Sequence, residues 1–214
     1  MNIISCGAQY RVIDLQNGRV QKNPLTRQES AEVVASWRGT AQAPVEGRVI
    51  NYRRAAISSA RSVQRLIEQY PEMASSFGNP IFEGTGVYTQ DHVVTFGAAL
   101  KKETAECKKA IESYVDLILL HWRYGVAELA FNSTLNNGLH ADCQVMLLDF
   151  GEITTSKMRV MAQIKTQRWL RAWSYNGGDI PAALQEYYRD RLSARLTLEA
   201  FDALWKTALS SQVL

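Results

Sequence analysis

The chain has 214 residues, of which 46% are hydrophobic and 21% are charged. This length suits one domain or two small lobes, and the composition excludes a largely disordered chain. The formal net charge of +3 is too small to indicate nucleic acid or an anionic membrane as a partner.

The three cysteines, Cys6, Cys107 and Cys143, lie far apart and form no CxxC pair. This spacing argues against a disulfide framework or a zinc site and favours a reducing cytoplasm. The longest apolar stretch, near residues 118–122, is far shorter than the roughly 20 residues of a membrane span. Because the first residues also lack the pattern of a signal peptide, we expect a cytoplasmic protein without membrane contact.

The N-terminal part predicts a small, mainly antiparallel sheet. Residues 10–15 are rich in strand-forming types, and residues 19–22 form the returning strand. Between them Asn17-Gly18 is a strong hairpin signal. Further short strands are expected at residues 81–82, 87–88 and 93–96.

Two helices are expected within this N-terminal part. Residues 26–37 predict a short helix, because Thr26 and Glu29 have the spacing of a capping box. Residues 54–70 predict a longer helix from their apolar periodicity.

The C-terminal part predicts helices around one short buried strand. Residues 102–123 form the clearest helix, with one apolar stripe made of Ile111, Tyr114, Val115, Ile118, Leu119 and Trp122. A polar loop is expected at 132–138, a buried strand at 145–148, and helices from 153 onward.

The segment most informative about function is the end of that buried strand. Asp149 follows the strand, and Asn136 precedes it in the polar loop. A carboxylate and an amide oxygen are ligands that Mg²⁺ accepts, and a metal held in this way can sit under a polyphosphate.

These residues resemble motifs of the protein-kinase superfamily. Asp149-Phe150-Gly151 resembles the DFG motif, and Asn136 resembles the catalytic-loop asparagine. Lys22 stands where the third-strand lysine of that family would lie. Residues 102–123 resemble the long helix before the catalytic loop, and residues 88–91 would be the hinge between lobes.

The resemblance implies an α+β, two-lobed fold. Its N-lobe would cover residues 1–97, and a truncated helical C-lobe would cover 98–214. ATP and Mg²⁺ are the implied cofactors, with Asp149 and Asn136 as metal ligands.

On the same resemblance Lys22 would bind the phosphates. Glu68 is the first choice for its ion-pair partner, with Glu29 or Glu32 as alternatives on the earlier helix. Gly7 is the single glycine that matches the glycine-rich loop.

The chain also departs from the family pattern. An aspartate is expected five residues before the catalytic-loop asparagine, and the corresponding residues are Phe131 or Asn132. Glu128 is the nearest upstream acid. The catalytic base is therefore unassigned, with Asn132 and Glu128 as weak candidates, and no Ala-Pro-Glu motif follows Gly151.

Structural explanations compete with each of these assignments. Asp149 could cap a turn, and Asn136 could belong only to a turn. Lys22 could be a solvated lysine on an edge strand, and Glu68 a solvated helix residue.

Two functions from different classes follow. The first is a kinase-like nucleotide-binding protein, either a pseudokinase or a weak atypical phosphotransferase, and whether it is an enzyme stays open. The alternative is a ligand-free interaction module that binds a protein partner through its helical C-lobe. A different transfer reaction in the same cleft is a third option that no residue selects.

Overall fold

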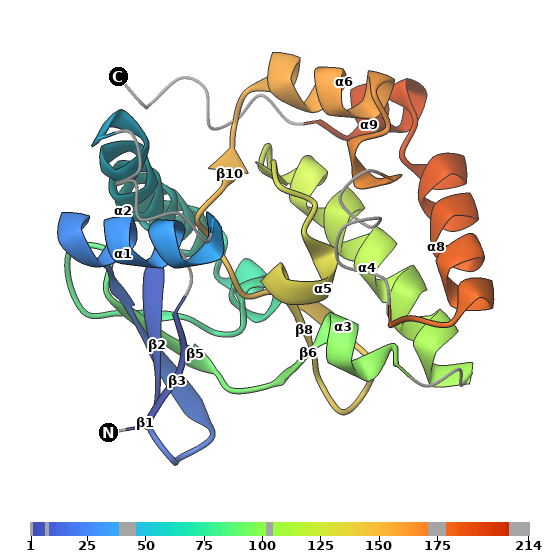
Figure 1. Cartoon of the computed structure of the whole chain (residues 1–214). Helices are drawn as coiled ribbons and strands as arrows, with labels where there is room; N and C mark the ends of the chain where they lie inside the picture. The colour runs from blue at the N-terminus through green and yellow to red at the C-terminus, as the bar shows by residue number, and fades with distance from the viewer. Residues whose placement is uncertain (1, 7–8, 39–45, 102–104, 171–178, 206–214) are drawn as a thin grey trace. The chain divides into compact units, whose positions relative to one another are not determined.

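The computed structural model describes residues 2–6, 9–38, 46–101, 105–170 and 179–205 (Figure 1). The chain forms two compact units. The first comprises Met1–His92 with Phe150–Glu152, and the second comprises Val93–Asp149 with Ile153–Leu214. The first boundary between the units along the sequence lies between His92 and Val93, whereas we expected it after residue 97.

The first unit contains a five-stranded antiparallel sheet in the order β1-β2-β3-β5-β4. Its strands are β1 (Asn2–Cys6), β2 (Tyr10–Asp14), β3 (Arg19–Pro24), β4 (Ile81–Phe82) and β5 (Tyr88–Asp91). The hairpin predicted at Asn17-Gly18 joins β2 to β3. Gly18 has a φ of +78°, a conformation that glycine adopts without steric cost.

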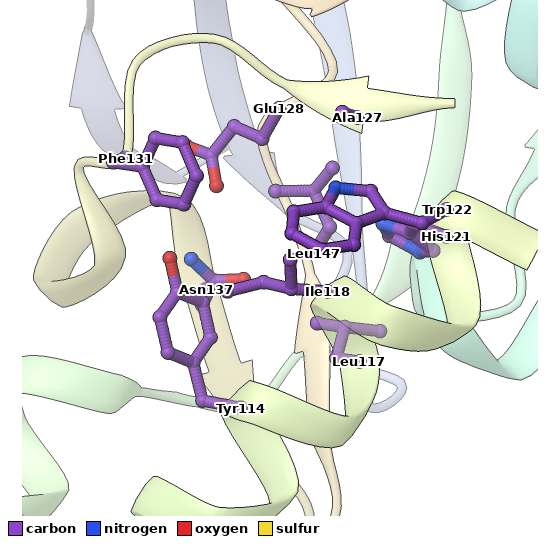
Figure 2. A pocket seen from close by; sticks show the side chains of 10 residues that line it. All are labelled: Tyr114, Leu117, Ile118, His121, Trp122, Ala127, Glu128, Phe131, Asn137 and Leu147. Atoms are coloured by element: carbon purple, nitrogen blue, oxygen red, sulfur yellow. The ribbon is translucent and has the colours of Figure 1, made fainter. Parts of the chain in front are cut away.

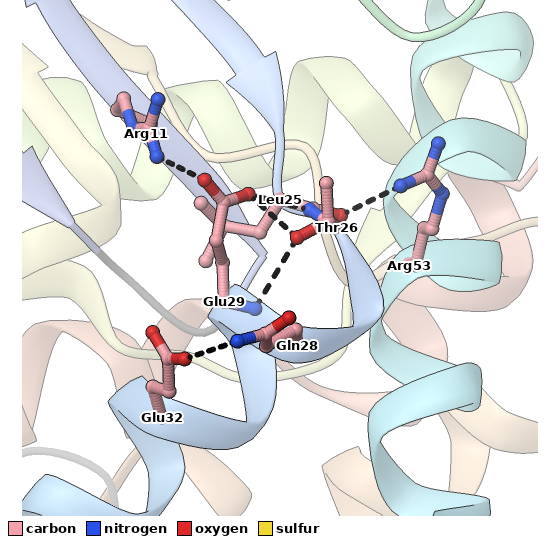
Figure 3. Close-up of polar contacts among 7 residues, drawn as sticks. All are labelled: Arg11, Leu25, Thr26, Gln28, Glu29, Glu32 and Arg53. Atoms are coloured by element: carbon pink, nitrogen blue, oxygen red, sulfur yellow. Dashed lines mark hydrogen bonds and ion pairs between the residues drawn. The ribbon is translucent and has the colours of Figure 1, made fainter.

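Three helical segments complete this unit: α1 (Arg27–Arg38), α2 (Glu46–Gln69) and η1 (Pro71–Phe77). The predicted capping box is confirmed (Figure 3). The Glu29 amide donates to Thr26 Oγ1 at 3.2 Å, and the Thr26 amide donates to Glu29 Oε2 at 2.8 Å. Helix α2 begins earlier than the predicted residue 54, and its buried face consists of Ala56, Ser59, Ala60, Val63 and Leu66.

The second unit is organised around α4 (Ala105–Arg123). Every residue of the predicted apolar stripe on this helix is buried. Full burial of each large apolar side chain contributes about 1.5–3 kcal/mol, so the stripe anchors the unit. The other helices are α3 (Phe96–Ala99), α5 (Ser133–Asn136), α6 (Lys157–Lys165), α8 (Ala182–Arg195) and α9 (Leu198–Leu204).

Two small antiparallel sheets also belong to the second unit. One has the order β6-β8-β9, formed by β6 (Val94–Thr95), β8 (Asn137–Leu139) and β9 (Val145–Leu147). The other pairs β7 (Ala127–Glu128) with β10 (Ile153–Thr154). The predicted α+β class with small antiparallel sheets is therefore confirmed.

Some local predictions were wrong. Residues 88–91 are not a hinge, because they form β5, which pairs with β3 and β4. The predicted polar loop at 132–138 contains α5 and most of β8. Residues 94–95 pair with β8 and not with the first sheet. Ile153–Thr154 is a strand and precedes the C-terminal helices.

Within the described ranges, no helix combines the length and the apolar character needed to cross a membrane.

Candidate functional site

Three polar residues around β8 and β9 form the candidate site. Glu128 ends β7, Asn136 ends α5, and Asp149 follows β9 after one intervening residue. All three belong to the second unit, so their arrangement is set by one folded body.

A hydrogen bond joins two of these side chains directly. Asn136 Nδ2 donates to Glu128 Oε1 at 2.9 Å. The backbone oxygen of Asn136 also accepts the amides of Leu148, at 2.7 Å, and Asp149, at 3.1 Å. The fold therefore brings the backbone of Asp149 next to Asn136, whose side chain contacts Glu128.

The backbone of Glu128 is held from two sides. In the β7–β10 ladder Glu128 is the partner of Ile153. Gln163, buried on α6, donates from Nε2 to the carbonyl oxygens of Glu128 at 3.3 Å and Leu129 at 2.8 Å. Glu128 itself is 8% exposed. A carboxylate supported in this way has little freedom to change position.

The backbone between Glu128 and Asn136 makes a tight turn before α5. Phe131 is buried and has a φ of +51°, which is uncommon for a residue other than glycine. The carbonyl oxygen of Asn132 then accepts the amides of Leu135 and Asn136. Asn132 is thus the N-cap residue, directly before α5.

A small cavity lies behind the Glu128 carboxylate (Figure 2). Helix α4 contributes one wall, and Glu128 and Phe131 lie opposite. Within the described parts of the chain, Trp122 Nε1 and Asn137 Oδ1 are among the buried polar atoms at this cavity that have no hydrogen-bond partner. The cavity is consequently a mostly apolar pocket that contains a few polar groups.

Burial changes the ionisation of the groups around this cavity. It lowers the pKa of His121 to about 3, so the imidazole is neutral near pH 7. Burial is also the main cause that raises the pKa of Tyr114 and of Tyr188, with the nearby Glu128 carboxylate adding to both shifts. These two hydroxyls therefore remain protonated.

The oxygen-rich donor set suits a hard cation. Asp149 has a carboxylate and Asn136 an amide oxygen, and both are predicted ligands. Mg²⁺ is typically bound through one or two carboxylates, keeps several waters and takes phosphate oxygens as further ligands. Among the residues that the structure describes, no group of three or more His, Cys, Asp or Glu forms a preassembled metal cage.

Lys22 belongs to the first unit and lies on β3, an interior strand between β2 and β5. Its neighbours across the ladder are Val12 and Tyr88, and only 7% of Lys22 is exposed. The alternative of a solvated edge-strand lysine is therefore wrong.

The three glutamates considered as partners of Lys22 make other contacts. Glu68 is exposed on α2 and accepts a hydrogen bond from Gln64 at 3.0 Å. Glu29 forms an ion pair with Arg11 and closes the capping box, while Glu32 accepts from Gln28 (Figure 3). Gly7, the remaining candidate, lies outside the described residues.

The residues that follow Asp149 pack within the first unit. Phe150 is fully buried, stacks on Tyr88 with ring centroids 4.6 Å apart, and meets Phe77 edge-on at 5.5 Å. Gln9 Nε2 donates to the carbonyl oxygen of Gly151 at 3.2 Å. A Cβ on residue 151 would lie 1.3 Å from Gln9 Oε1, so a larger residue there would require the Gln9 side chain to move.

Sequence reasoning missed the supporting residues Gln9 and Gln163 and undervalued Glu128. The sequence offered one signal for Glu128, which is the single acidic residue between Asp116 and Asp142. Neither glutamine carries such a signal, since each acts on backbone atoms that are distant in sequence.

Comparisons with known proteins do not assign a family. No protein-family model matches the chain, and no curated protein matches it in sequence. One solved structure, described as the complex structure of Rv3197-erythromycin from Mycobacterium tuberculosis, matches with a TM-score of 0.45 and 13% identity. The match covers 81% of this chain and 53% of that one, so the chain spans about half the length of that protein. A likeness this distant assigns neither family nor activity.

Proposed function

We propose that this chain is a kinase-like protein that binds ATP together with Mg²⁺. The observation that carries the proposal is the hydrogen-bonded group of Glu128, Asn136 and Asp149, which places oxygen ligands immediately before a Phe-Gly pair. The chain is either a pseudokinase-type binding module or a weak phosphotransferase, because the usual catalytic aspartate is missing from its expected position.

Each proposed ligand has a defined role. Asp149 and Asn136 bind the Mg²⁺, which neutralises charge on the phosphates when it is present. Lys22 is proposed to bind a phosphate, as the third-strand lysine does in the kinases that this chain resembles. Positioning and charge neutralisation supply most of the catalysis in phosphoryl transfer, so these residues support binding first and slow turnover second.

The experiment is calorimetric titration of ATP into the protein, with Mg²⁺ and with a chelator. We expect binding that needs the metal and is weakened, but still measurable, in Asn136→Ala. It should be weakened about tenfold or more in Lys22→Met, because a charge-assisted hydrogen bond disappears. Lys109, exposed on α4, provides the matched control Lys109→Met. Absence of any metal-dependent binding would reject the proposal and favour a ligand-free module whose helical C-terminal part binds a protein partner.

A further inference from the structure

We infer that Glu128 is a positioning residue, which orients the side chain of Asn136 so that its amide oxygen faces a divalent cation. This inference rests on the proposed function and deepens it. It assigns to Glu128 a contribution to cation binding that is exerted through Asn136.

The direction of the hydrogen bond supports this assignment. Asn136 Nδ2 donates to Glu128 Oε1 at 2.9 Å, so the nitrogen edge of the planar amide faces Glu128. The oxygen Oδ1 is then on the opposite edge of the amide. No hydrogen bond within the described ranges uses that oxygen, which leaves it available as a ligand. Without Glu128, the amide could turn over and present nitrogen, which cannot bind a cation.

Rigidity supports the same conclusion. Glu128 is almost fully buried, its backbone pairs with Ile153, and its carbonyl oxygen accepts from Gln163. Asn136 is fixed in turn by the two amides that its own carbonyl oxygen accepts. A ligand held by such a second layer of contacts loses little freedom when it binds a metal.

Charge adds to the effect of geometry. A hydrogen bond to an ionised carboxylate is stronger than one to a neutral acceptor. It also polarises the amide and increases the negative charge on Oδ1. Both consequences strengthen the bond between Asn136 and a hard cation.

The experiment measures the affinity for Mn²⁺, in place of Mg²⁺, by electron paramagnetic resonance with and without ATP. The proteins are the full-length wild type, Glu128→Ala, Glu128→Gln, Asn136→Ala and the double variant Glu128→Ala/Asn136→Ala. Glu186, exposed on α8, supplies the matched control Glu186→Gln.

We expect Glu128→Ala to weaken Mn²⁺ binding about 10–100-fold, as is typical for the loss of a residue that supports a metal ligand. Glu128→Gln keeps an acceptor oxygen and should lose less. The double variant should bind no more weakly than Asn136→Ala, because Glu128 acts through Asn136.

Two results would overturn the inference while leaving the proposed function intact. One is an unchanged Mn²⁺ affinity in both Glu128 variants, even if ATP turnover falls, since Glu128 would then act on a proton and not on the ligand. The other is fully additive losses in the double variant. A wild type that binds no Mn²⁺ with ATP would reject the proposed function itself. Circular dichroism in the near ultraviolet identifies any variant that fails to fold, and Glu128→Gln then decides the question.

Discussion

The burial of His121 makes the stability of the protein depend on pH. This residue is 4% exposed, and burial lowers its pKa from 6.5 to about 3. Between these values the unfolded chain binds a proton that the native state cannot accept. Stability therefore falls as the pH decreases below 6.5 and stops falling near pH 3.

The size of the effect follows from the two pKa values. One pH unit inside the window costs about 1.4 kcal/mol, so lowering the pH from 7 to 5 should cost about 2 kcal/mol. Glu29 and Glu112 have native pKa values below 4.5, so their contributions are lost only at lower pH. The difference between the wild type and a variant without this histidine therefore measures its contribution in the interval from pH 7 to 5.

Urea denaturation at pH 7 and pH 5 measures this cost. We compare the wild type with His121→Gln, which cannot titrate, and with the exposed control His92→Gln. The wild type and the control should lose about 2 kcal/mol more than His121→Gln over this interval. Equal losses in all three proteins would refute the argument from burial. Glu128 lines the same cavity, so Glu128→Gln tests whether its charge reduces the loss.

Three further perturbations test the packing of each unit. Thr26→Ala should lower the free energy of unfolding by about 1 kcal/mol, while Thr26→Ser should preserve it, as chemical denaturation can determine. Glu112→Gln removes the charge that Arg191 contacts between α4 and α8, which should cost about 0.5–1 kcal/mol. This difference from the wild type should shrink as the pH falls below 4.5 and through the lowered native pKa of Glu112. Gly151→Ala should destabilise the chain by about 1–3 kcal/mol. Adding Gln9→Ala should relieve part of that loss, and strictly additive losses would contradict the predicted clash.

Features specified by neighbouring residues were predictable from the sequence. The turn at Asn17-Gly18, the capping box of Thr26 and the apolar stripe of residues 111–122 each depend on contacts within one element or one hairpin. The α+β class followed from such local signals. The early start of α2 was missed because Gly47 is a residue that disfavours helices.

Features that depend on distant contacts were not predictable. Residues 88–91 form a strand because β3 and β4 pair with them on both sides. The short helix α5 and strand β8 owe their existence to neighbours such as β9, since one helical turn is unstable alone.

The candidate site shows the same division between local and distant information. Asp149 and Asn136 were proposed from motif order along the chain. The bond between Asn136 and Glu128 was not, because it requires the turn at Phe131 and the ladder between β7 and β10. Glu68 illustrates the reverse case. Its position along the chain suggested an ion pair with Lys22, but in the structure it accepts a hydrogen bond from Gln64.

The most direct test of the proposed function is thermal stability with and without ATP and Mg²⁺. The proteins are the wild type, Asp149→Ala and the control Asp190→Ala, whose aspartate is exposed on α8. Ligand at 100 times its Kd should stabilise the wild type and the control by about 2.7 kcal/mol. The midpoint of thermal unfolding should rise by about 5–10 °C. This rise should require the metal and should be absent in Asp149→Ala. No shift in the wild type, or an equal shift in Asp149→Ala, would contradict the account.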